Sequence, residues 1–212
     1  MASRDSLEKE QLIKDVLSCE WPMFHEINGS AARAACQLDE DRFCRMRACQ
    51  YRVWSRRHLE SWLYDLRAAR EQGRNLPAEK YIRMMETTHP GEYARFSAHL
   101  PRIPEAARRQ ISEILSIQLE WKAELDRLYP ALMRKGRPSE NSGNDTSGEV
   151  SFAVYFRAEL MTFSAKTVAI FHDDILSILK DGGNAYREIL LNEVRAAGYE
   201  SLEKAEAACQ RG

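Results

Sequence analysis

Hydrophobic residues recur at the spacing of an amphipathic helix along nearly the whole chain of 212 residues. Runs that alternate polar and β-branched residues, which mark half-buried strands, are nearly missing. We therefore predict an all-α protein, folded as a single-domain multi-helix bundle. The predicted helices cover residues 5–20, 30–37, 40–72, 77–89, 91–98, 104–134, 149–181, 184–197 and 200–209.

One segment interrupts this helical pattern clearly. Residues 136–149 read GRPSENSGNDTSGE and contain none of the large apolar residue types. Gly, Ser, Asn and Asp in such a cluster favour turns and loops over helix. We predict a mobile loop that joins the N-terminal helices (5–134) to the C-terminal helices (149–209) within one helical domain spanning 1–212.

The predicted helix 40–72 carries polar residues on its apolar face. Arg47 and Gln50 fall within or beside the arc that holds Phe43 and Met46. A neighbouring stripe holds Cys44, Tyr51 and His58. Two interpretations remain open. Arg47 could extend along the surface while Gln50 caps a backbone group, or both could donate to a ligand, since a buried donor without an acceptor is costly.

The predicted helix 149–181 is apolar around most of its circumference, as is typical of a central helix. Tyr155, Glu159 and Lys166 nevertheless lie on one stripe of it, at helical spacing. A buried charge must be compensated, so Glu159 and Lys166 need partners. Those partners could belong to an internal salt-bridge network that fixes helix packing, or to a ligand.

Glu20 lies between Ile13 and Val16 on the apolar face of the first predicted helix. The preferred interpretation is a last-turn residue that already faces solvent. The alternative is a carboxylate that belongs to a site.

The segment 79–93, EKYIRMMETTHPGEY, combines charges with an inward histidine. Glu79, Arg83 and Glu86 share one face of its predicted helix, where Glu79 and Arg83 would form an exposed pair. His89 falls on the core side, directly before a proline. A lone inward histidine is more often a satisfied core residue than a ligand, and both roles are kept here.

Glu86 and His89 form a Glu-x-x-His pair, the spacing by which helical carboxylate sites present two metal ligands. Glu20 and Glu159 could add two glutamates, but the chain contains no second Glu-x-x-His. We therefore predict no metal and no cofactor, because no cofactor fingerprint is present either. A divalent metal held by these four residues is kept as an alternative.

Composition narrows the classes of partner. Charged residues make up 30% of the chain and leave a formal net charge of −1, so no overall basic field attracts nucleic acid. No apolar stretch is long enough for a membrane span. The five cysteines match no zinc or disulfide spacing. These features predict a cytoplasmic protein with reduced thiols that binds neither nucleic acid nor membranes, with a homodimer as a possible assembly.

Four segments together resemble a known family. They are WPMFHEINGSAARAACQ (21–37), FCRMRACQYRVW (43–54), GRNLPAEKYIRMMETTHPGEY (73–93) and YFRAELMTFS (155–164). They are similar to a bacterial family catalogued only as a domain of unknown function. The resemblance implies a compact helical protein with a shared site near these motifs. The chain departs from the family pattern at Phe163, where a tyrosine is expected.

These motifs contain the same inward polar residues, so we predict an enzyme with a polar pocket between the helices. It would carry out non-redox acid–base chemistry of the lyase, isomerase or hydrolase type on a small anionic, amino-acid-like metabolite. Predicted catalytic residues are His89, Glu159, Lys166, Glu86 and Tyr155. Predicted substrate-binding residues are Arg33, Gln37, Arg47, Gln50, Arg83, Trp21 and Asn28.

A second hypothesis is a helical binding or adaptor module without catalysis. Its inward polar residues would only specify packing, and exposed arginines would contact a partner protein. The candidate arginines are Arg56, Arg57, Arg108 and Arg109.

Overall fold

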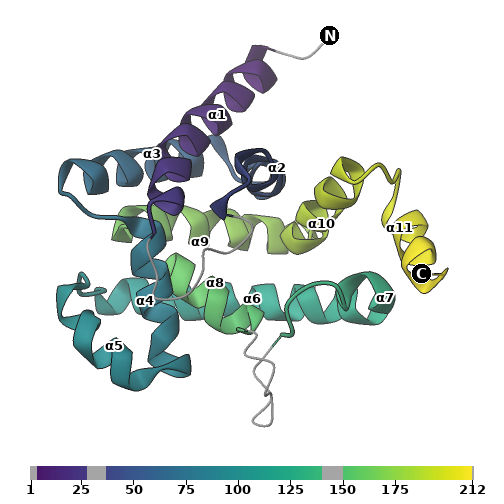
Figure 1. Cartoon of the computed structure of the whole chain (residues 1–212). Coiled ribbons are helices and arrows are strands. Elements are labelled where there is room, and N and C mark those ends of the chain that lie inside the picture. Colours follow the sequence, from purple (N-terminus) through teal and green to yellow (C-terminus); the bar gives the residue numbers. More distant parts are fainter. Residues whose placement is uncertain (1–3, 28–36, 140–149, 212) are drawn as a thin grey trace.

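The computed structural model describes residues 4–27, 37–139 and 150–211, and this part of the chain is helical without any strand (Figure 1). The prediction of an all-α, multi-helix fold is therefore confirmed. The α-helices are α1 (Arg4–His25), α2 (Glu40–Tyr51), α3 (Arg56–Glu71), α4 (Leu76–Thr88), α5 (Pro90–Phe96), α6 (Glu105–Leu128), α7 (Pro130–Met133), α8 (Phe152–Leu160), α9 (Ala165–Lys180), α10 (Ala185–Ala196) and α11 (Leu202–Arg211); a short 3₁₀ turn, η2, covers Ser97–His99.

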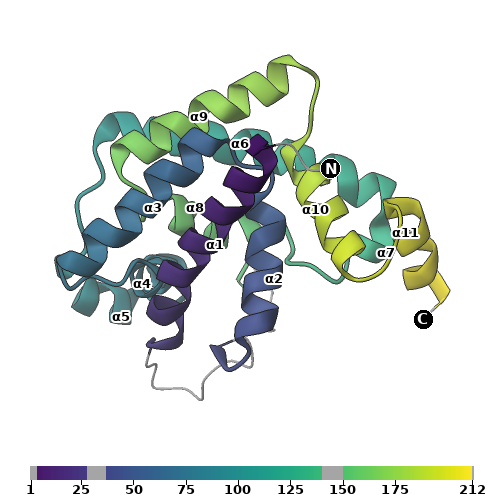
Figure 2. The same ribbon diagram turned by 90° about the horizontal axis from the view of Figure 1, so that it is seen from above.

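The main hydrophobic core lies where α1, α3, α6, α8 and α9 meet. Leu59, Leu66, Ile114 and Leu160 are completely buried there. Helix α1 packs on α2 and α3, α6 packs on α8 and α9, and α4 packs on α8. A second apolar cluster joins the end of α6 and α7 to α10 and α11, which lie at one end of the molecule (Figure 2).

Two long predicted helices are each broken in the structure. The predicted helix 40–72 divides into α2 and α3, because Ser55 accepts a hydrogen bond from the backbone N–H of His58 and starts a new helix. The predicted helix 149–181 divides into α8 and α9 in the same way, at Ser164. The prediction of one central helix over 149–181 is therefore wrong, and side chains on either side of Ser164 share no continuous face.

Other predicted boundaries shift. Helix α1 continues through Pro22 to His25 instead of ending at residue 20. The predicted helix 104–134 ends before Pro130 and restarts as the short α7. Of the predicted helix 30–37, only Gln37 belongs to the described residues, and most of the predicted loop 136–149 also lies outside them. No helix in the described ranges is long and apolar enough to span a membrane.

Candidate functional site

The buried interface of α1, α2 and α8 holds a guanidinium between two carboxylates. The Nη2 and Nε atoms of Arg47 donate to the Oε1 and Oε2 atoms of Glu20 over 2.7 and 3.3 Å. The Nη1 atom of Arg47 donates to Oε1 of Glu159 over 2.7 Å, and also to the side chain of Gln50. The hydroxyl of Tyr51 accepts from Arg47 and donates to Glu20. Every donor direction of Arg47 is thus directed at an acceptor from the chain itself.

Helix α4 adds a second cation to this group. The Nζ atom of Lys80 lies 3.8 Å from Oε2 of Glu159 and donates to the hydroxyl of Tyr155 over 2.9 Å. The same Nζ atom lies 4.3 Å from the centroid of the Tyr155 ring, a cation–π contact. We call this set the charge network; its members are Glu20, Arg47, Gln50, Tyr51, Lys80, Tyr155 and Glu159.

The charge network balances two cations with two carboxylates, and these four side chains are only 4% to 11% exposed. Burial alone raises the pKa of Glu159, but Arg47 and Lys80 outweigh burial and hold that pKa below its ordinary value. Burial alone lowers the pKa of Lys80, but Tyr155 and Glu159 outweigh it and raise that pKa. Near neutral pH both groups therefore stay charged.

A cavity of about 250 Å³ lies elsewhere, between α4, the segment 97–103, α6 and α8. We call it the arginine pocket, because four arginines line it. A smaller cavity of about 120 Å³ shares part of its wall and extends it along α8. The charged residues that line the arginine pocket are Arg83, Arg102, Arg108, Arg157 and Glu86.

Arg83 differs from the other buried cations of the described chain. Only 6% of it is exposed, and its Nε atom is buried without a hydrogen-bond partner. Buried Lys80 and Lys122 each have a carboxylate oxygen within 4.0 Å, in Glu159 and Asp126. Within the described ranges Arg83 forms no such ion pair, and its guanidinium donates only to the carbonyl of Pro101, over 2.9 Å. Burial lowers the pKa of Arg83, and Glu79 offsets part of that effect.

The other three arginines of the pocket are exposed at its rim. The Nε atom of Arg108 donates to the carbonyl of Ile103 over 3.1 Å. Within the described ranges neither Arg102, Arg108 nor Arg157 forms an ion pair with a carboxylate. Glu86 supplies the one carboxylate of the lining. The arginine pocket therefore carries an excess of positive charge that the chain itself does not neutralise.

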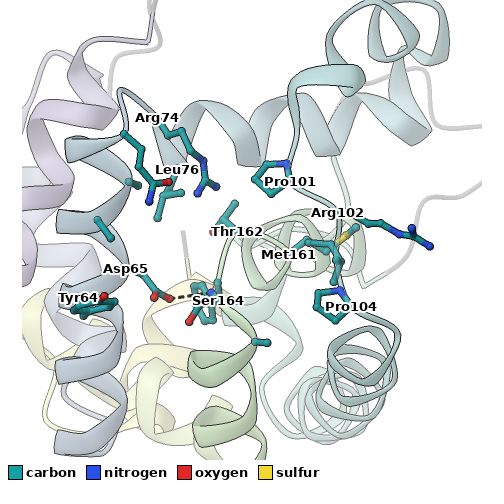
Figure 3. A pocket seen from close by; sticks show the side chains of 16 residues that line it. Tyr64, Asp65, Arg74, Leu76, Pro101, Arg102, Pro104, Met161, Thr162 and Ser164 are labelled. Carbon is teal, nitrogen blue, oxygen red and sulfur yellow. Dashed lines mark hydrogen bonds between the residues drawn. The ribbon is translucent and has the colours of Figure 1, made fainter.

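A larger cavity, of about 300 Å³, lies beyond Pro101 and Met161, on the side of α3 (Figure 3). Its buried carboxylate, Asp65, accepts from the backbone N–H of Ser164 over 2.9 Å and from the hydroxyl of Thr167 over 2.6 Å. Its inner arginine, Arg74, forms two hydrogen bonds with Glu79. Because these charged groups already have partners, the arginine pocket is the stronger candidate for a ligand site.

Comparison with known protein families assigns the chain to one of them. The profile of a family described as "Protein of unknown function (DUF4125)" matches residues 10–207. The chain belongs to this family. Neither the curated proteins nor the solved structures contain a match. The resemblance noted in the sequence is therefore confirmed at the level of the family, which brings no reaction with it, and the site must be interpreted from its own geometry.

Several predicted site residues come together in the charge network. Arg47, Gln50, Tyr155 and Glu159 meet there, and Arg47 pairs with Glu159 directly. The lysine that approaches Glu159 is Lys80 and not Lys166. Lys166 is exposed, because the chain turns at Ser164 before it. None of the three cavities described above is lined by a member of the network.

Three expectations about burial are wrong. Glu20 is 5% exposed and does not face solvent, because α1 continues past it and α2 covers that side. Glu79 is buried and not a surface residue, since Arg74 from the loop before α4 pairs with it over 2.8 Å. Met46, in the predicted apolar arc of helix 40–72, is 51% exposed.

His89 was expected to face the core and is instead exposed. It lies at the junction where α4 ends and α5 begins, and its Nδ1 atom lies 3.0 Å from the hydroxyl of Thr88. Pro90 begins a new helix here, so the periodicity of α4 no longer determines where His89 points. Glu86, also exposed, remains at the arginine pocket with Arg83.

The remaining predicted binding residues lie near the end of α1. Trp21 is half-buried and packs against the rings of His25 and Phe43. Gln37 is buried, and its amide donates to the carbonyl of Ile27 over 3.2 Å. Asn28 and Arg33 lie outside the described residues.

The four residues considered as alternative metal ligands do not lie together in the structure. Glu20 and Glu159 both bind Arg47, Glu86 lies at the arginine pocket, and His89 is exposed. Throughout the described ranges, no group of three or more His, Cys, Asp or Glu side chains could hold a metal ion.

Sequence reasoning did not single out Lys80, Arg102 or Arg157, and it treated Arg108 as a surface arginine. For Lys80 a signal existed: counted from the start of α4 at Leu76, it falls on the same face as the buried Met84. Arg102 lies outside any helix, where helical periodicity gives no information. Arg108 lies on an exposed face of α6, which gave no sign of a cavity beside it.

Proposed function

We propose that this protein binds a small anionic metabolite in the arginine pocket and carries out non-redox acid–base chemistry on it. The observation that carries the proposal is the buried guanidinium of Arg83, which lines the cavity without a carboxylate partner in the described chain. A buried charge without a partner costs several kcal/mol of folding stability, roughly 3–5 where a pair has been broken. An anionic ligand at Arg83 would supply the missing partner.

The chemistry of the lining also supports an anion. A guanidinium fork donates two parallel hydrogen bonds to carboxylate or phosphate oxygens. Arg102, Arg108 and Arg157 at the rim would attract such a ligand and partly balance its negative charge. The hydroxyls of Tyr93 and Ser97 on the same wall provide neutral donors.

Glu86 is the proposed general base. It lies one helical turn after Arg83 on α4, so a ligand bound by Arg83 comes within reach of its carboxylate. A proton taken from the ligand by Glu86 can be returned to another ligand atom, which is the step shared by lyase and isomerase reactions. The lining of this pocket does not include the other four predicted catalytic residues, Glu159, Tyr155, Lys166 and His89.

The binding step can be tested by thermal denaturation with defined anions: acetate, succinate, L-aspartate, L-glutamate and inorganic phosphate at constant ionic strength. A ligand that binds only the folded protein raises its melting temperature. We expect at least one of these anions to do so in the wild type and not in Arg83→Met. Arg109→Met is the matched control, because Arg109 is exposed, neighbours Arg108 and does not line the pocket. An equal response of all three proteins would refute the proposal.

The catalytic step needs a separate readout. The wild type and Glu86→Gln are incubated in D₂O with each anion that binds, and deuterium incorporation into the anion or its conversion is followed by mass spectrometry. We expect Glu86→Gln to bind the anion but to be slower by a factor of about 10² or more, the usual contribution of a general base.

The adaptor hypothesis is the second candidate, favoured by one observation. The charge network is internally paired and lies away from the described cavities, as expected of polar residues that specify packing. Anion binding in the wild type without any exchange or conversion would favour this binding module over the enzyme.

A further inference from the structure

We infer that the ligand of the arginine pocket carries a phosphoryl group. This inference rests on the proposed function, since it specifies which anion the same pocket selects. It replaces the amino-acid-like carboxylate expected from the sequence by a group with more charge and more acceptor oxygens.

The first argument is the charge of the lining. Four guanidinium groups face one carboxylate, that of Glu86, which leaves a surplus of three positive charges around a cavity of about 250 Å³. In the charge network the same protein matches two cations with two carboxylates. A single ligand carboxylate would neutralise only one charge of the surplus. A phosphate monoester carries about −1.5 to −2 near neutral pH and neutralises most of it.

The second argument is the set of directions from which the arginines approach the cavity. The four arginines come from four different segments: Arg83 from α4, Arg102 from the segment after η2, Arg108 from the first turns of α6, and Arg157 from α8. Donors that surround a cavity in this way suit an acceptor with oxygens pointing in several directions. A phosphoryl group presents three such oxygens, whereas a planar carboxylate presents two and is satisfied by one guanidinium fork.

The third argument is that groups around the pocket have fixed positions and that room remains for the rest of a ligand. Arg83 is held at its Nη2 atom by the carbonyl of Pro101, so its guanidinium has a fixed position at the wall. The hydroxyl of Ser112 donates its proton to the carbonyl of Arg108. The hydroxyl oxygen of Ser112, which lines the pocket, can therefore accept a hydrogen bond from a ligand hydroxyl. The adjoining cavity of about 120 Å³ provides room for the remainder of a small phosphorylated metabolite.

The experiment is calorimetric titration of the purified full chain with three probes: inorganic phosphate, succinate and L-aspartate, at constant ionic strength and pH 7.5. We expect phosphate to bind at least about tenfold more tightly than either carboxylate, because each additional charge-assisted hydrogen bond contributes about that factor or more. Arg108→Met and Arg157→Met, both at exposed positions, should each weaken phosphate binding by about tenfold. Arg109→Met should leave it unchanged.

The outcomes separate the two proposals. If succinate or L-aspartate binds as tightly as phosphate and Arg83→Met abolishes that binding, the phosphoryl inference is overturned and the anion site stands. If no probe binds, or if Arg83→Met binds every probe as well as the wild type, both are overturned. If phosphate binds selectively but Arg108→Met, Arg157→Met and Arg109→Met behave alike, the rim arginines do not select the ligand and the inference is likewise overturned.

Discussion

Two buried guanidinium groups in this protein have opposite surroundings. Arg47 lies between Glu20 and Glu159 and donates to acceptors on every side. Arg83 lies at a cavity and has one backbone acceptor within the described chain. Both side chains are largely shielded from solvent, so burial alone does not indicate a ligand site. The presence or absence of a compensating carboxylate does.

The two regions are built on the same pair of helices. Helix α4 provides Lys80 to the charge network and Arg83 to the arginine pocket, and α8 provides Glu159 to the first and Arg157 to the second. The ion pair of Lys80 and Glu159 connects α4 to α8 and so holds two walls of the arginine pocket in place. We interpret the network as the support of the pocket.

The largest expected effect is at the network. Arg47→Met leaves two buried carboxylates with Lys80 as the one remaining cation of the charge network, so we expect the free energy of unfolding to fall by about 3–5 kcal/mol. Urea denaturation measures it. The control is Arg52→Met, whose exposed pair with Glu10 should contribute about 1 kcal/mol or less. If both variants lose the same small amount, the network does not stabilise the fold.

His58 extends the comparison to a buried polar group that is uncharged. Neither ring nitrogen has a partner among the described residues, and the ring is stacked between Trp54 and Phe171. Burial lowers the pKa of His58 from 6.5 to about 3. The folded ring therefore stays neutral where the unfolded ring takes a proton, and stability falls as pH drops from about 6.5 towards 3, by up to about 1.4 kcal/mol per pH unit.

The variant His58→Phe should abolish the loss of stability at low pH that His58 causes. It also removes the two buried ring nitrogens that have no hydrogen-bond partner among the described residues. We expect a higher melting temperature at pH 7, corresponding to about 1–3 kcal/mol, and a difference from the wild type that widens between pH 6.5 and 5. Parallel melting curves of the two proteins across that range would show that His58 takes up its proton in the folded state.

At the arginine pocket the sign of the stability change should be opposite to that at the network. Arg83→Met removes an uncompensated charge and one hydrogen bond, and we expect the unfolding free energy to rise by about 1 kcal/mol in buffer without phosphate or carboxylate. A loss of about 2 kcal/mol or more would mean that Arg83 is a structural residue like Arg47.

A comparably small effect concerns the turn between α8 and α9. Ser164→Ala removes the side chain that accepts from the N–H of Thr167, so we expect a loss of about 1 kcal/mol without any change in anion binding. A weakened response to anions in this variant would show that the turn also positions the wall at Met161.

The fold class and several members of the charge network could be predicted from helical periodicity. Periodicity located Arg47 and Glu159 on inward faces, because both lie within uninterrupted helices. It failed where a serine or proline starts a new helix, as before Lys166 and at His89, since each start resets the direction of every later side chain.

Most of the lining of the arginine pocket could not be predicted from the sequence. Arg83 and Glu86 lie on a helix and were found, whereas Arg102 and Arg108 reach the pocket only through the path of the chain from η2 into α6. The lysine partner of Glu159 was missed for a related reason. Lys80 meets it through the packing of α4 on α8, which is a tertiary contact without a local pattern.

The central claim is that the unpaired Arg83 marks a site for an anion. The most direct test is the melting temperature of the wild type and of Arg83→Met, each with and without inorganic phosphate at constant ionic strength. We expect phosphate to raise the melting temperature of the wild type and to leave that of Arg83→Met unchanged, with Arg83→Met the more stable protein in the absence of phosphate. An equal rise in both proteins, or no rise in either, would contradict the claim.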